Sequence, residues 1–365
     1  MEKKQTDMES FMRAGMPLIT VVIATFNSTK LLPMVIGALR KQTYPQECLE
    51  ILAVDGGSSD GTRQMAESMG CRVIDNPLTE PVHAKYLGFQ AARGKYLMYL
   101  DHDEEVVNPD ALAEIIATFR QFPDVRTVDS SGYINPEGYP LVNEYINEFG
   151  EPFSFFMYRQ SRGMGFHLPA VVRQARMTAE GPHAIIFAPA PSNNRLFIEN
   201  LAAGVVTDID FVKNQVAIEK AQDLCHLFFL LNEKGASFAV AKNNPLRHYS
   251  GDTWAKFLAK IRWRIKNNIF HLDGVGAAGF TGRQSFQPTS LSIRKFLFLP
   301  YAFTLIFPLV DGVWLSFSRR QALYMAHPLL TLYTAWKICH YMVLKMVGYH
   351  PEMMSYDEKS VIKGK

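Results

Sequence analysis

Short apolar runs alternate with helix-like segments over residues 18–101, and this alternation constrains the fold more than any other feature of the sequence. The apolar runs have the length and composition of buried strands, and they are residues 18–24, 49–54, 71–74 and 96–100. Apolar residues recur at helical spacing between them, in residues 31–41, 62–69 and 82–92. Strands that alternate with helices predict a mostly parallel, Rossmann-like sheet with flanking helices. The expected fold class is therefore α/β.

Polar residues follow the carboxyl ends of three of these strands. They are Thr25 and Asn27 after the first strand, Asp55 after the second, and Asp101 and Asp103 after the fourth. Ligands of parallel sheets bind at the carboxyl ends of the strands, so we expect these side chains along one edge. A nucleotide base could pair with Asp55, while Asp101 and Asp103 hold a hard divalent cation that bridges a diphosphate. The alternative is a solvated acidic loop that ends a strand and caps the next helix.

The composition argues against several classes of protein. The chain has 365 residues with a net charge of +3, which gives no general case for binding nucleic acid. Its four cysteines lie far apart in the sequence, which indicates a reducing compartment and no disulfide framework. The first 15 residues are charged and lack the apolar segment of a secretory signal.

Four segments together resemble the successive signatures of family 2 glycosyltransferases. They are Val21–Asn27, Gln42–Pro45, Val54–Thr62 and Ala92–Asp103. The resemblance implies a GT-A fold, a UDP- or GDP-sugar as donor, Mg²⁺ or Mn²⁺ on Asp101 and Asp103, and inversion at the anomeric carbon. It also implies that Asp55 recognises the base and that Lys85 lies near the nucleotide. Gly56 stands where the family often has a second aspartate, and this departure weakens no step of the chemistry.

An acidic pair resembles the catalytic motif of the same family in a weakened form. Asp223 matches the end of that motif, but Lys220 and Ala221 stand where the family usually has acids. Inverting transfer requires one base to take the proton of the acceptor hydroxyl. We predict Asp223 as this base, with Glu219 on the same helix face as the second candidate. A structural role for the pair is an equal alternative.

Two further predictions concern residues after this motif. His248 is a candidate metal or phosphate contact, although a lone histidine is more often structural. Arg262 and Trp263 resemble the end of the Gln-x-x-Arg-Trp motif of processive polysaccharide synthases, which implies a place near the donor. Ala259 replaces the glutamine of that motif, and this mismatch favours transfer of a single sugar.

Residues 254–267 predict a basic helix in which five cations are interleaved with aromatic and aliphatic residues. This mixture is typical of helices that lie on an anionic membrane surface.

Two apolar stretches follow, residues 296–317 and 323–347. The first is long enough to span a bilayer but contains Asp311, and the second contains four lysines and histidines, which are costly at its centre. If both crossed the membrane, Arg319 and Arg320 between them would face away from a cytosolic catalytic domain, against the positive-inside tendency. The sequence therefore predicts broken or amphipathic helices at the cytoplasmic face of the cell membrane, peripheral, monotopic or as a shallow hairpin. A two-span hairpin and a soluble packing or dimer contact are the alternatives.

These observations predict one catalytic domain with a membrane-interacting extension. The expected parts are an N-terminal tail (1–16), a GT-A catalytic domain (17–250), a basic helix with linker (251–295), hydrophobic membrane-interacting helices (296–350) and a C-terminal tail (351–365). The predicted function is metal-dependent, inverting transfer of one sugar from a nucleotide-diphosphate sugar to a lipid-linked or other membrane-borne acceptor, in polysaccharide or glycolipid assembly. The alternatives are a polyprenyl-phosphate glycosyltransferase, whose anionic nucleophile needs little base catalysis, and a catalytically silent nucleotide-binding subunit.

Overall fold

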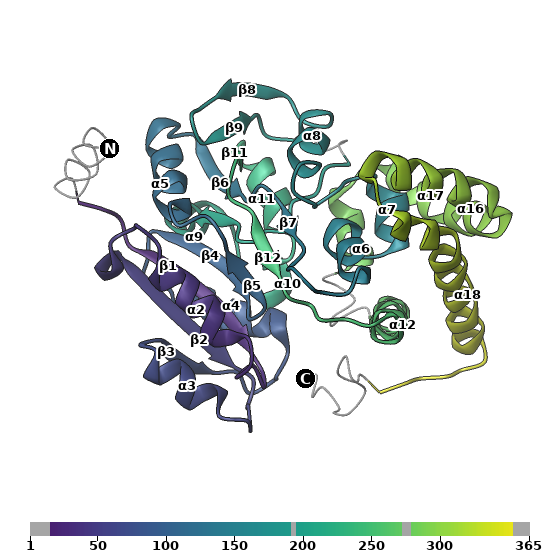
Figure 1. The fold of residues 1–365 in the computed structure, drawn as a ribbon, viewed down its shortest axis with the longest axis horizontal. Coiled ribbons are helices and arrows are strands. Elements are labelled where there is room, and N and C mark those ends of the chain that lie inside the picture. Colours follow the sequence, from purple (N-terminus) through teal and green to yellow (C-terminus); the bar gives the residue numbers. More distant parts are fainter. Residues whose placement is uncertain (1–14, 191–194, 272–278, 353–365) are drawn as a thin grey trace. The chain divides into compact units, whose positions relative to one another are not determined.

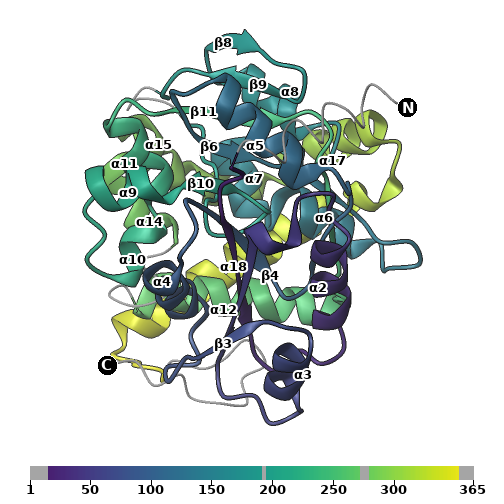
Figure 2. The same cartoon turned by 90° about the vertical axis from the view of Figure 1, so that its left-hand side faces the viewer.

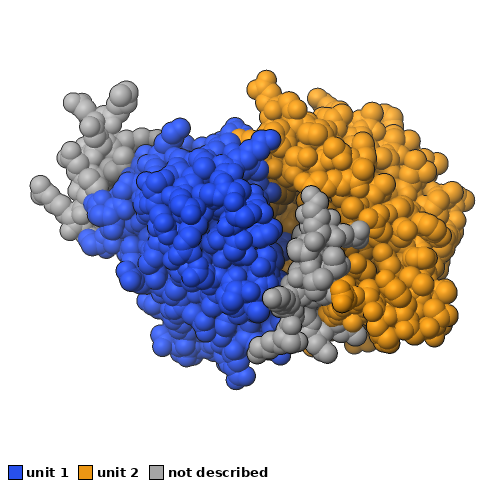
Figure 3. Space-filling model, turned by 90° about the horizontal axis from the view of Figure 1, so that it is seen from below, with its two compact units in different colours: residues 1–131, 177–189, 198–247 blue, residues 132–176, 190–197, 248–365 orange. Residues whose placement is uncertain are grey.

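The computed structural model describes residues 15–190, 195–271 and 279–352, which form two compact units (Figure 3). Unit 1 consists of residues 1–131, 177–189 and 198–247, and unit 2 of residues 132–176, 190–197 and 248–365. The expected tails lie almost wholly outside the described residues. Unit 2 takes residues 132–176 from within the segment that we expected to form the catalytic domain.

Unit 1 is built on a nine-stranded sheet with the order β3-β2-β1-β4-β10-β6-β11-β9-β8 (Figure 1 and Figure 2). Its strands are β1 (Ile19–Thr25), β2 (Leu49–Asp55), β3 (Arg72–Asp75), β4 (Tyr96–Asp101), β6 (Val125–Asp129), β8 (Met177–Glu180), β9 (Ala184–Phe187), β10 (Val206–Asp208) and β11 (Ser237–Ala241). Strands β3, β2, β1 and β4 are parallel, and β10 is antiparallel to β4. The α/β class predicted from the alternation of strands and helices is confirmed.

Helices occupy the connections between these strands. They are α2 (Leu32–Arg40), α3 (Thr62–Ser68), α4 (Pro81–Ala91), α5 (Ala111–Gln121), α9 (Ile209–Gln215), α10 (Ala221–Leu224) and α11 (Leu227–Glu233), with a 3₁₀ turn at Gln46–Cys48 and a short strand β5 (Glu104–Val106). The first three helices agree with the predicted segments to within one or two residues.

A close approach of α4 to β1 shapes the part of unit 1 that matters most below. A Cβ added to Gly88 of α4 would lie only 2.3 Å from a methyl of Val22 in β1, so only glycine permits this packing. Val22 belongs to a core that also buries Val54, Leu97 and Tyr99 under the helices. Because α4 is held this close to the sheet, its residue Lys85 is carried to the ends of the central strands.

Unit 2 is largely helical. Its elements are β7 (Tyr133–Ile134), α6 (Val142–Phe149), α7 (Pro152–Tyr158), α8 (His167–Val172), α12 (Trp254–Phe270), α14 (Phe280–Arg283), α15 (Thr289–Arg294), α16 (Phe298–Thr304), α17 (Ile306–Arg319) and α18 (His327–Met346), with 3₁₀ turns at Gln284–Phe286, Lys295–Leu297 and Ala322–Ala326; strand β12 (Leu246–His248) lies at the boundary of the two units. One core combines apolar side chains of α6, α12, α17 and α18.

Helix α12 is the basic helix that we expected at a membrane surface, and its apolar face is instead part of the unit 2 core. Phe257, Ile261 and Ile265 are buried there. Two of its cations, Lys256 and Lys260, bracket the fully buried carboxylate of Asp252 at 2.9 and 2.6 Å. An amphipathic basic helix has the same sequence pattern on a bilayer and on a protein core, so the predicted place of α12 at a membrane surface stays a prediction.

The apolar stretch 296–317 is broken, as predicted. Leu305 has a φ of 58° and separates α16 from α17, and the axes of residues 289–304 and 306–319 are bent by 86°. Within the described part of the chain, no single helix has the length and hydropathy to cross a membrane, whereas this bent pair passes that test of length and composition.

Candidate active site

The ends of the central strands bring three predicted residues to one edge of the sheet. Thr25 of β1 is paired with Asp55 of β2, and the preceding Ala24 is paired with Asp101 of β4. Neighbouring strands lie about 4.8 Å apart, so Asp55 and Asp101, with β1 between them, are separated by roughly 10 Å. The predicted convergence of Thr25, Asp55 and Asp101 along one edge is confirmed.

Asp55 organises the turn that follows β2. Its side chain is buried; Oδ2 accepts hydrogen bonds from the backbone N–H groups of Gly57 (3.2 Å) and Ser58 (3.0 Å), and Oδ1 accepts from the hydroxyls of Ser58 (2.5 Å) and Thr25 (3.3 Å). A carboxylate offers about four lone-pair sites, and these bonds use that number. A nucleotide base that bonds Asp55 therefore has to replace one of these donors, and the predicted base-recognising role of Asp55 stays a prediction.

Asn27 joins the loop after β1 to the loop after β2. Its Oδ1 accepts from the backbone N–H of Ser59 (3.0 Å), and its own backbone N–H donates to the hydroxyl of Ser58 (2.9 Å). Asp60 adds a second link, because its carboxylate accepts from the hydroxyls of Thr29 and Thr62. The bond from Thr62 is the main reason that the pKa of Asp60 is lowered to about 2. Asn27 and Asp60 thus hold the loops that follow β1 and β2 in position.

Lys85 forms a close ion pair with Asp101. Its Nζ lies 2.6 Å from Asp101 Oδ1, and the lysine side chain is 8% exposed whereas that of the aspartate is 39% exposed. Burial alone would lower the pKa of Lys85, but the negative charge of Asp101, followed by those of Glu104 and Glu199, raises it above the ordinary value. Lys85 therefore remains an ammonium, and Asp101 contacts both this cation and solvent.

Glu104 is a site residue that the sequence analysis treated only as part of an acidic loop. It is almost completely buried, and its carboxylate accepts from the backbone N–H groups of Asp101 (2.9 Å) and Ala203 (3.3 Å). These bonds close the turn that carries Asp101 and Asp103. The signal in the sequence was an acid three residues after Asp101, a spacing that suits a side chain bonding back to the start of a turn.

Phe26 is a second site residue that we did not predict from the sequence. It follows β1 directly and is 44% exposed, which is unusual for a phenylalanine at the end of a buried strand. A Cβ added to Gly56 would be 3.5 Å from the Phe26 ring, so this ring lies beside the turn that follows Asp55. An exposed ring at this place offers a stacking surface for a base.

Asp101 and Asp103 supply carboxylate oxygens, the donors that Mg²⁺ and Mn²⁺ prefer, so their chemistry fits the cation that the family resemblance implies. His248 belongs to unit 2, where its Nδ1 lies 2.6 Å from Asn147 Oδ1 and its ring lies 5.2 Å from that of Tyr133. Among the residues that the structure describes, no three His, Cys, Asp or Glu side chains are grouped as a metal site requires. A shared ligand set of Asp101, Asp103 and His248 stays a prediction.

The predicted base, Asp223, stabilises the start of α10. Its Oδ2 accepts from the backbone N–H groups of Lys220 and Glu219, each at 2.9 Å. The hydroxyl of Tyr86, the residue after Lys85 in α4, donates to the backbone carbonyl of Glu219 at 3.0 Å. The segment that carries both candidate bases is therefore attached to α4, and their catalytic role stays a prediction.

Arg262 and Trp263 lie on α12 in unit 2. Trp263 is buried and Arg262 is partly buried. Their predicted contact with the donor stays a prediction.

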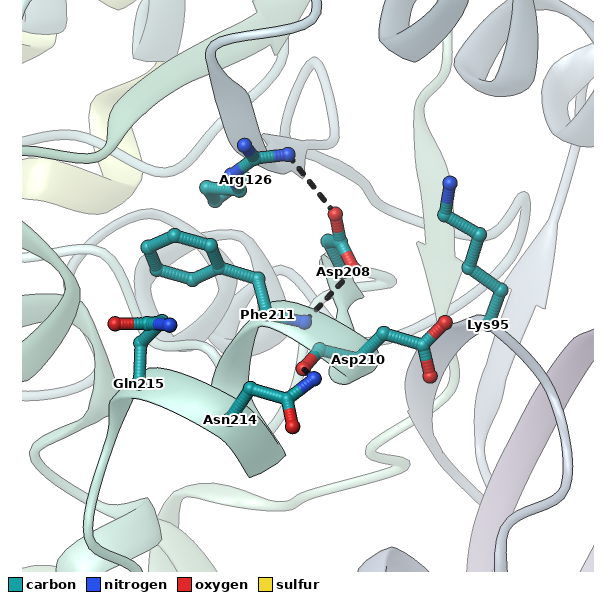
Figure 4. Close-up of a pocket in the computed structure, with 7 residues that line it drawn as sticks. All are labelled: Lys95, Arg126, Asp208, Asp210, Phe211, Asn214 and Gln215. Carbon is teal, nitrogen blue, oxygen red and sulfur yellow. Dashed lines mark hydrogen bonds and ion pairs between the residues drawn. The ribbon is translucent and has the colours of Figure 1, made fainter.

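A separate shallow pocket of about 270 Å³ lies at the start of β4, at the other end of that strand from Asp101 (Figure 4). Arg126 forms an ion pair with Asp208 at 3.0 Å across it, and Asp208 also accepts from the backbone N–H of Phe211 at the start of α9. These contacts stabilise the sheet and α9, and the pocket is not part of the candidate active site.

Unit 1 has a parallel half-sheet whose strands end in Asp55 and Asp101, with an antiparallel strand β10 beside β4, which is the α/β sheet that the resemblance to GT-A domains predicts. Residues 20–178 match the family model described as Glycosyl transferase family 2, the family that the sequence motifs resemble.

Curated relatives match a similar portion of the chain. Glycosyltransferase AglE of Haloferax volcanii is 29% identical over 98 residues, which cover 25% of this chain and 32% of that protein. The PGL/p-HBAD biosynthesis glycosyltransferase of Mycobacterium bovis is 30% identical over 107 residues, which cover 28% of this chain and 41% of the relative. The chain thus spans about a third to two fifths of the length of these relatives.

Among solved structures, the mannosyltransferase PcManGT of Pyrobaculum calidifontis, in complex with GDP-Man and Mn²⁺, superposes with a TM-score of 0.47 at 15% identity, over 89% of this chain and 88% of that one.

Proposed function

We propose that this protein is a glycosyltransferase that moves a single sugar from a UDP- or GDP-sugar to an acceptor, with inversion at the anomeric carbon. The observation that carries the proposal is the convergence of Asp55 and Asp101 on one sheet edge in a family 2 domain. Residues at this edge offer a surface for a base at one end and a cation-binding turn at the other, roughly a nucleotide's length apart.

A Mg²⁺ or Mn²⁺ ion held by Asp101 and Asp103 would neutralise charge that develops on the leaving diphosphate. Lys85 adds a permanent positive charge beside the same carboxylate, at 2.6 Å. A fixed, buried cation stabilises an anionic leaving group without reorganising solvent. The chain's own contribution to this step is therefore electrostatic.

The proton of an acceptor hydroxyl would go to Asp223, or to Glu219, which lies in the segment before α10 and not on one helix face with Asp223 as the sequence predicted. The bonds of Asp223 Oδ2 to two backbone N–H groups favour a second candidate acceptor. They occupy part of the carboxylate's capacity to accept hydrogen bonds, and a phosphate nucleophile requires no base. Transfer to a polyprenyl phosphate is therefore the alternative reaction.

We place this reaction at the cytoplasmic face of the cell membrane, with a lipid-linked or other membrane-borne acceptor. Supporting this is the exposed apolar surface of α16 and α17, which includes Phe303, Ile306 and Phe317. A large exposed apolar surface is uncommon on soluble monomeric proteins.

The test is product formation by the purified full chain from a panel of UDP- and GDP-sugars, with Mn²⁺ or Mg²⁺ and a membrane lipid extract, analysed by mass spectrometry. We expect one glycosylated lipid product, and its loss in Asp103→Asn with no loss of fold by circular dichroism. If the wild-type protein binds nucleotide but neither transfers nor hydrolyses any donor, the proposal is wrong and the chain is a silent nucleotide-binding subunit.

A further inference from the structure

Helix α17 exposes apolar side chains on its outer side, whereas a helix on the surface of a soluble protein turns its polar residues outward. Its buried positions are Pro308, Gly312 and Leu315. Its exposed side chains include Ile306, Phe307, Leu309, Val310, Val313, Trp314 and Phe317, with exposures from 37 to 82%. Between residues 296 and 318 the only charged residue is Asp311.

Asp311 does not disturb this apolar face, because it points to the inner side. Its Oδ1 lies 2.7 Å from a guanidinium nitrogen of Arg159, and its Oδ2 accepts from the hydroxyl of Tyr301 at 2.6 Å. Tyr301 belongs to α16, so this carboxylate joins the two arms of the bent pair. The charge is neutralised within unit 2.

His327 at the start of α18 extends the same network. Because Tyr301 donates its only proton to Asp311, the Nε2–H of His327 donates to Tyr301 (3.0 Å), and Nδ1 accepts from the hydroxyl of Tyr145 (2.7 Å). The imidazole is fully buried and neutral in this tautomer. Residues of α6, α16, α17 and α18 are thereby linked through one chain of hydrogen bonds.

The far end of α17 is anchored as well. Arg319 donates from Nε and a terminal nitrogen to Glu148 Oε1 of α6, at 2.8 and 2.6 Å, and its guanidinium lies 3.9 Å from the ring centre of Phe166. Arg319 therefore belongs to the interior of unit 2. The sequence suggested Arg319 as a charge that marks one side of a membrane, and its ion pair with Glu148 shows that it does not have that role. With Asp311 and Arg319 both fixed inward, α17 cannot straighten away from the unit without breaking the buried Arg319–Glu148 pair and the partly exposed Asp311–Arg159 pair.

The bend itself forms a projecting corner of apolar residues. Phe303, Leu305, Ile306 and Phe307 are all exposed there, and Leu305 holds the 86° turn with its positive φ. Cations flank the stretch, with the partly exposed Lys295 before it and the exposed Arg320 after it, whereas Arg294 donates to the carbonyl of Phe156 within unit 2. An apolar corner flanked by cations is complementary to an anionic lipid surface, where chains accept the rings and headgroups pair with the charges.

We propose that the α16–α17 corner is a monotopic wedge, which inserts into one leaflet of an anionic lipid bilayer and does not cross it. The inference is independent of the proposed reaction, because lipid binding requires no donor. The inward anchors keep α17 on unit 2, while the outward side chains enter the acyl region only to the depth of a side-chain layer.

Flotation of the full-length protein with vesicles tests this inference. The wild-type chain should float with vesicles that contain a third phosphatidylglycerol and weakly with pure phosphatidylcholine. The variant Phe307→Asp/Val310→Asp should bind at least about tenfold more weakly, since two exposed apolar side chains that would enter the lipid become charges. The matched control is Leu141→Asp/Val172→Asp, which changes two exposed apolar residues elsewhere in unit 2 and should bind as the wild type does.

Depth is measured by quenching of Trp314 fluorescence with brominated lipids, with Trp314→Phe to subtract the other tryptophans. Bromine near the headgroup should quench Trp314 more than bromine near the chain end. Equal flotation of the wild type and the Phe307→Asp/Val310→Asp variant overturns the wedge, as does stronger quenching at the bilayer centre. A third outcome also overturns the wedge: the wild-type protein binds neither kind of vesicle and sediments as a dimer, while the variant sediments as a monomer. The corner would then be the contact with a second copy of the chain.

Discussion

The ammonium of Lys85 lies 2.6 Å from Asp101 Oδ1 and is almost wholly buried, so a permanent cation already contacts the first aspartate of the predicted metal site. A divalent ion that binds Asp101 has to share this carboxylate with Lys85 or displace the amine. The lysine therefore opposes binding of the metal alone, and it assists binding of an anionic diphosphate.

Replacing Lys85 by methionine should tighten Mn²⁺ binding to the donor-free protein by about tenfold or more. At an effective dielectric of about 20, a positive charge about 5 Å from the ion costs on the order of 3 kcal/mol per unit charge, and solvent reduces this. Electron paramagnetic resonance of free Mn²⁺ during a titration measures the dissociation constant. The same variant should bind UDP or GDP more weakly.

The control for this prediction is Lys85→Arg, which keeps the charge and should leave the Mn²⁺ affinity within a few fold of the wild type. If Lys85→Met binds Mn²⁺ no more tightly than the wild type, Asp101 is not a ligand of the ion.

A change of Asp101 to asparagine should destabilise unit 1 as well as remove the metal site. Lys85 would lose the nearest group that offsets its burial, and breaking a buried pair costs about 3–5 kcal/mol. Because Asp101 is 39% exposed, we expect about 1–3 kcal/mol here, measured as a lower urea midpoint. The double variant Lys85→Met/Asp101→Asn should recover most of this loss. Additive losses in the double variant would show that the two side chains do not interact.

The edge on which these residues meet could be predicted from the sequence. Strand length, helical spacing and alternation fix a parallel half-sheet, and in such a sheet the residues after β1, β2 and β4 must share one edge. Thr25, Asp55 and Asp101 are found there because of backbone register alone.

The partners of these side chains could not be predicted in the same way. Whether Asp55 faces a ligand or its own turn depends on backbone dihedrals at Gly57 and Ser58, and the sequence pattern does not distinguish them. Acids are rarely buried without partners. Glu104 can be buried because the fold brings two backbone N–H groups to its carboxylate, and each donates a hydrogen bond to it. The core position of α12 was likewise hidden, since only tertiary contacts decide which surface covers an amphipathic helix.

Asp223→Asn should separate the two candidate acceptors. Asparagine keeps a side-chain oxygen that can accept from the N–H groups of Lys220 and Glu219, so α10 should remain capped. Asparagine is not a base, and loss of a general base lowers the rate by about 10²–10⁴-fold. We expect a fall of this size in kcat with a hydroxyl acceptor and less than about tenfold with a polyprenyl phosphate.

Glu219→Gln is the matched variant for this comparison, since it removes the second candidate and leaves the capping carboxylate unchanged. A full loss in Glu219→Gln with normal turnover in Asp223→Asn would reverse their assigned roles. Equal turnover of all three proteins with a hydroxyl acceptor would mean that neither acid is the base.

The buried imidazole of His327 should make unit 2 less stable in mild acid. Burial lowers its pKa from 6.5 to about 4, a trend that Asp311 opposes only in part. The unfolded chain therefore binds a proton between about pH 6.5 and 4 that the folded chain does not, so the free energy of unfolding is highest above pH 6.5 and falls as the pH drops through this window. The shift corresponds to about 3 kcal/mol at pH 4.

Urea unfolding followed by the near-ultraviolet signal of the tryptophans in unit 2 should show this loss. The variant His327→Gln keeps a donor toward Tyr301 and should lower the number of protons taken up on unfolding by one. Identical pH slopes in the two proteins would contradict a neutral, buried His327.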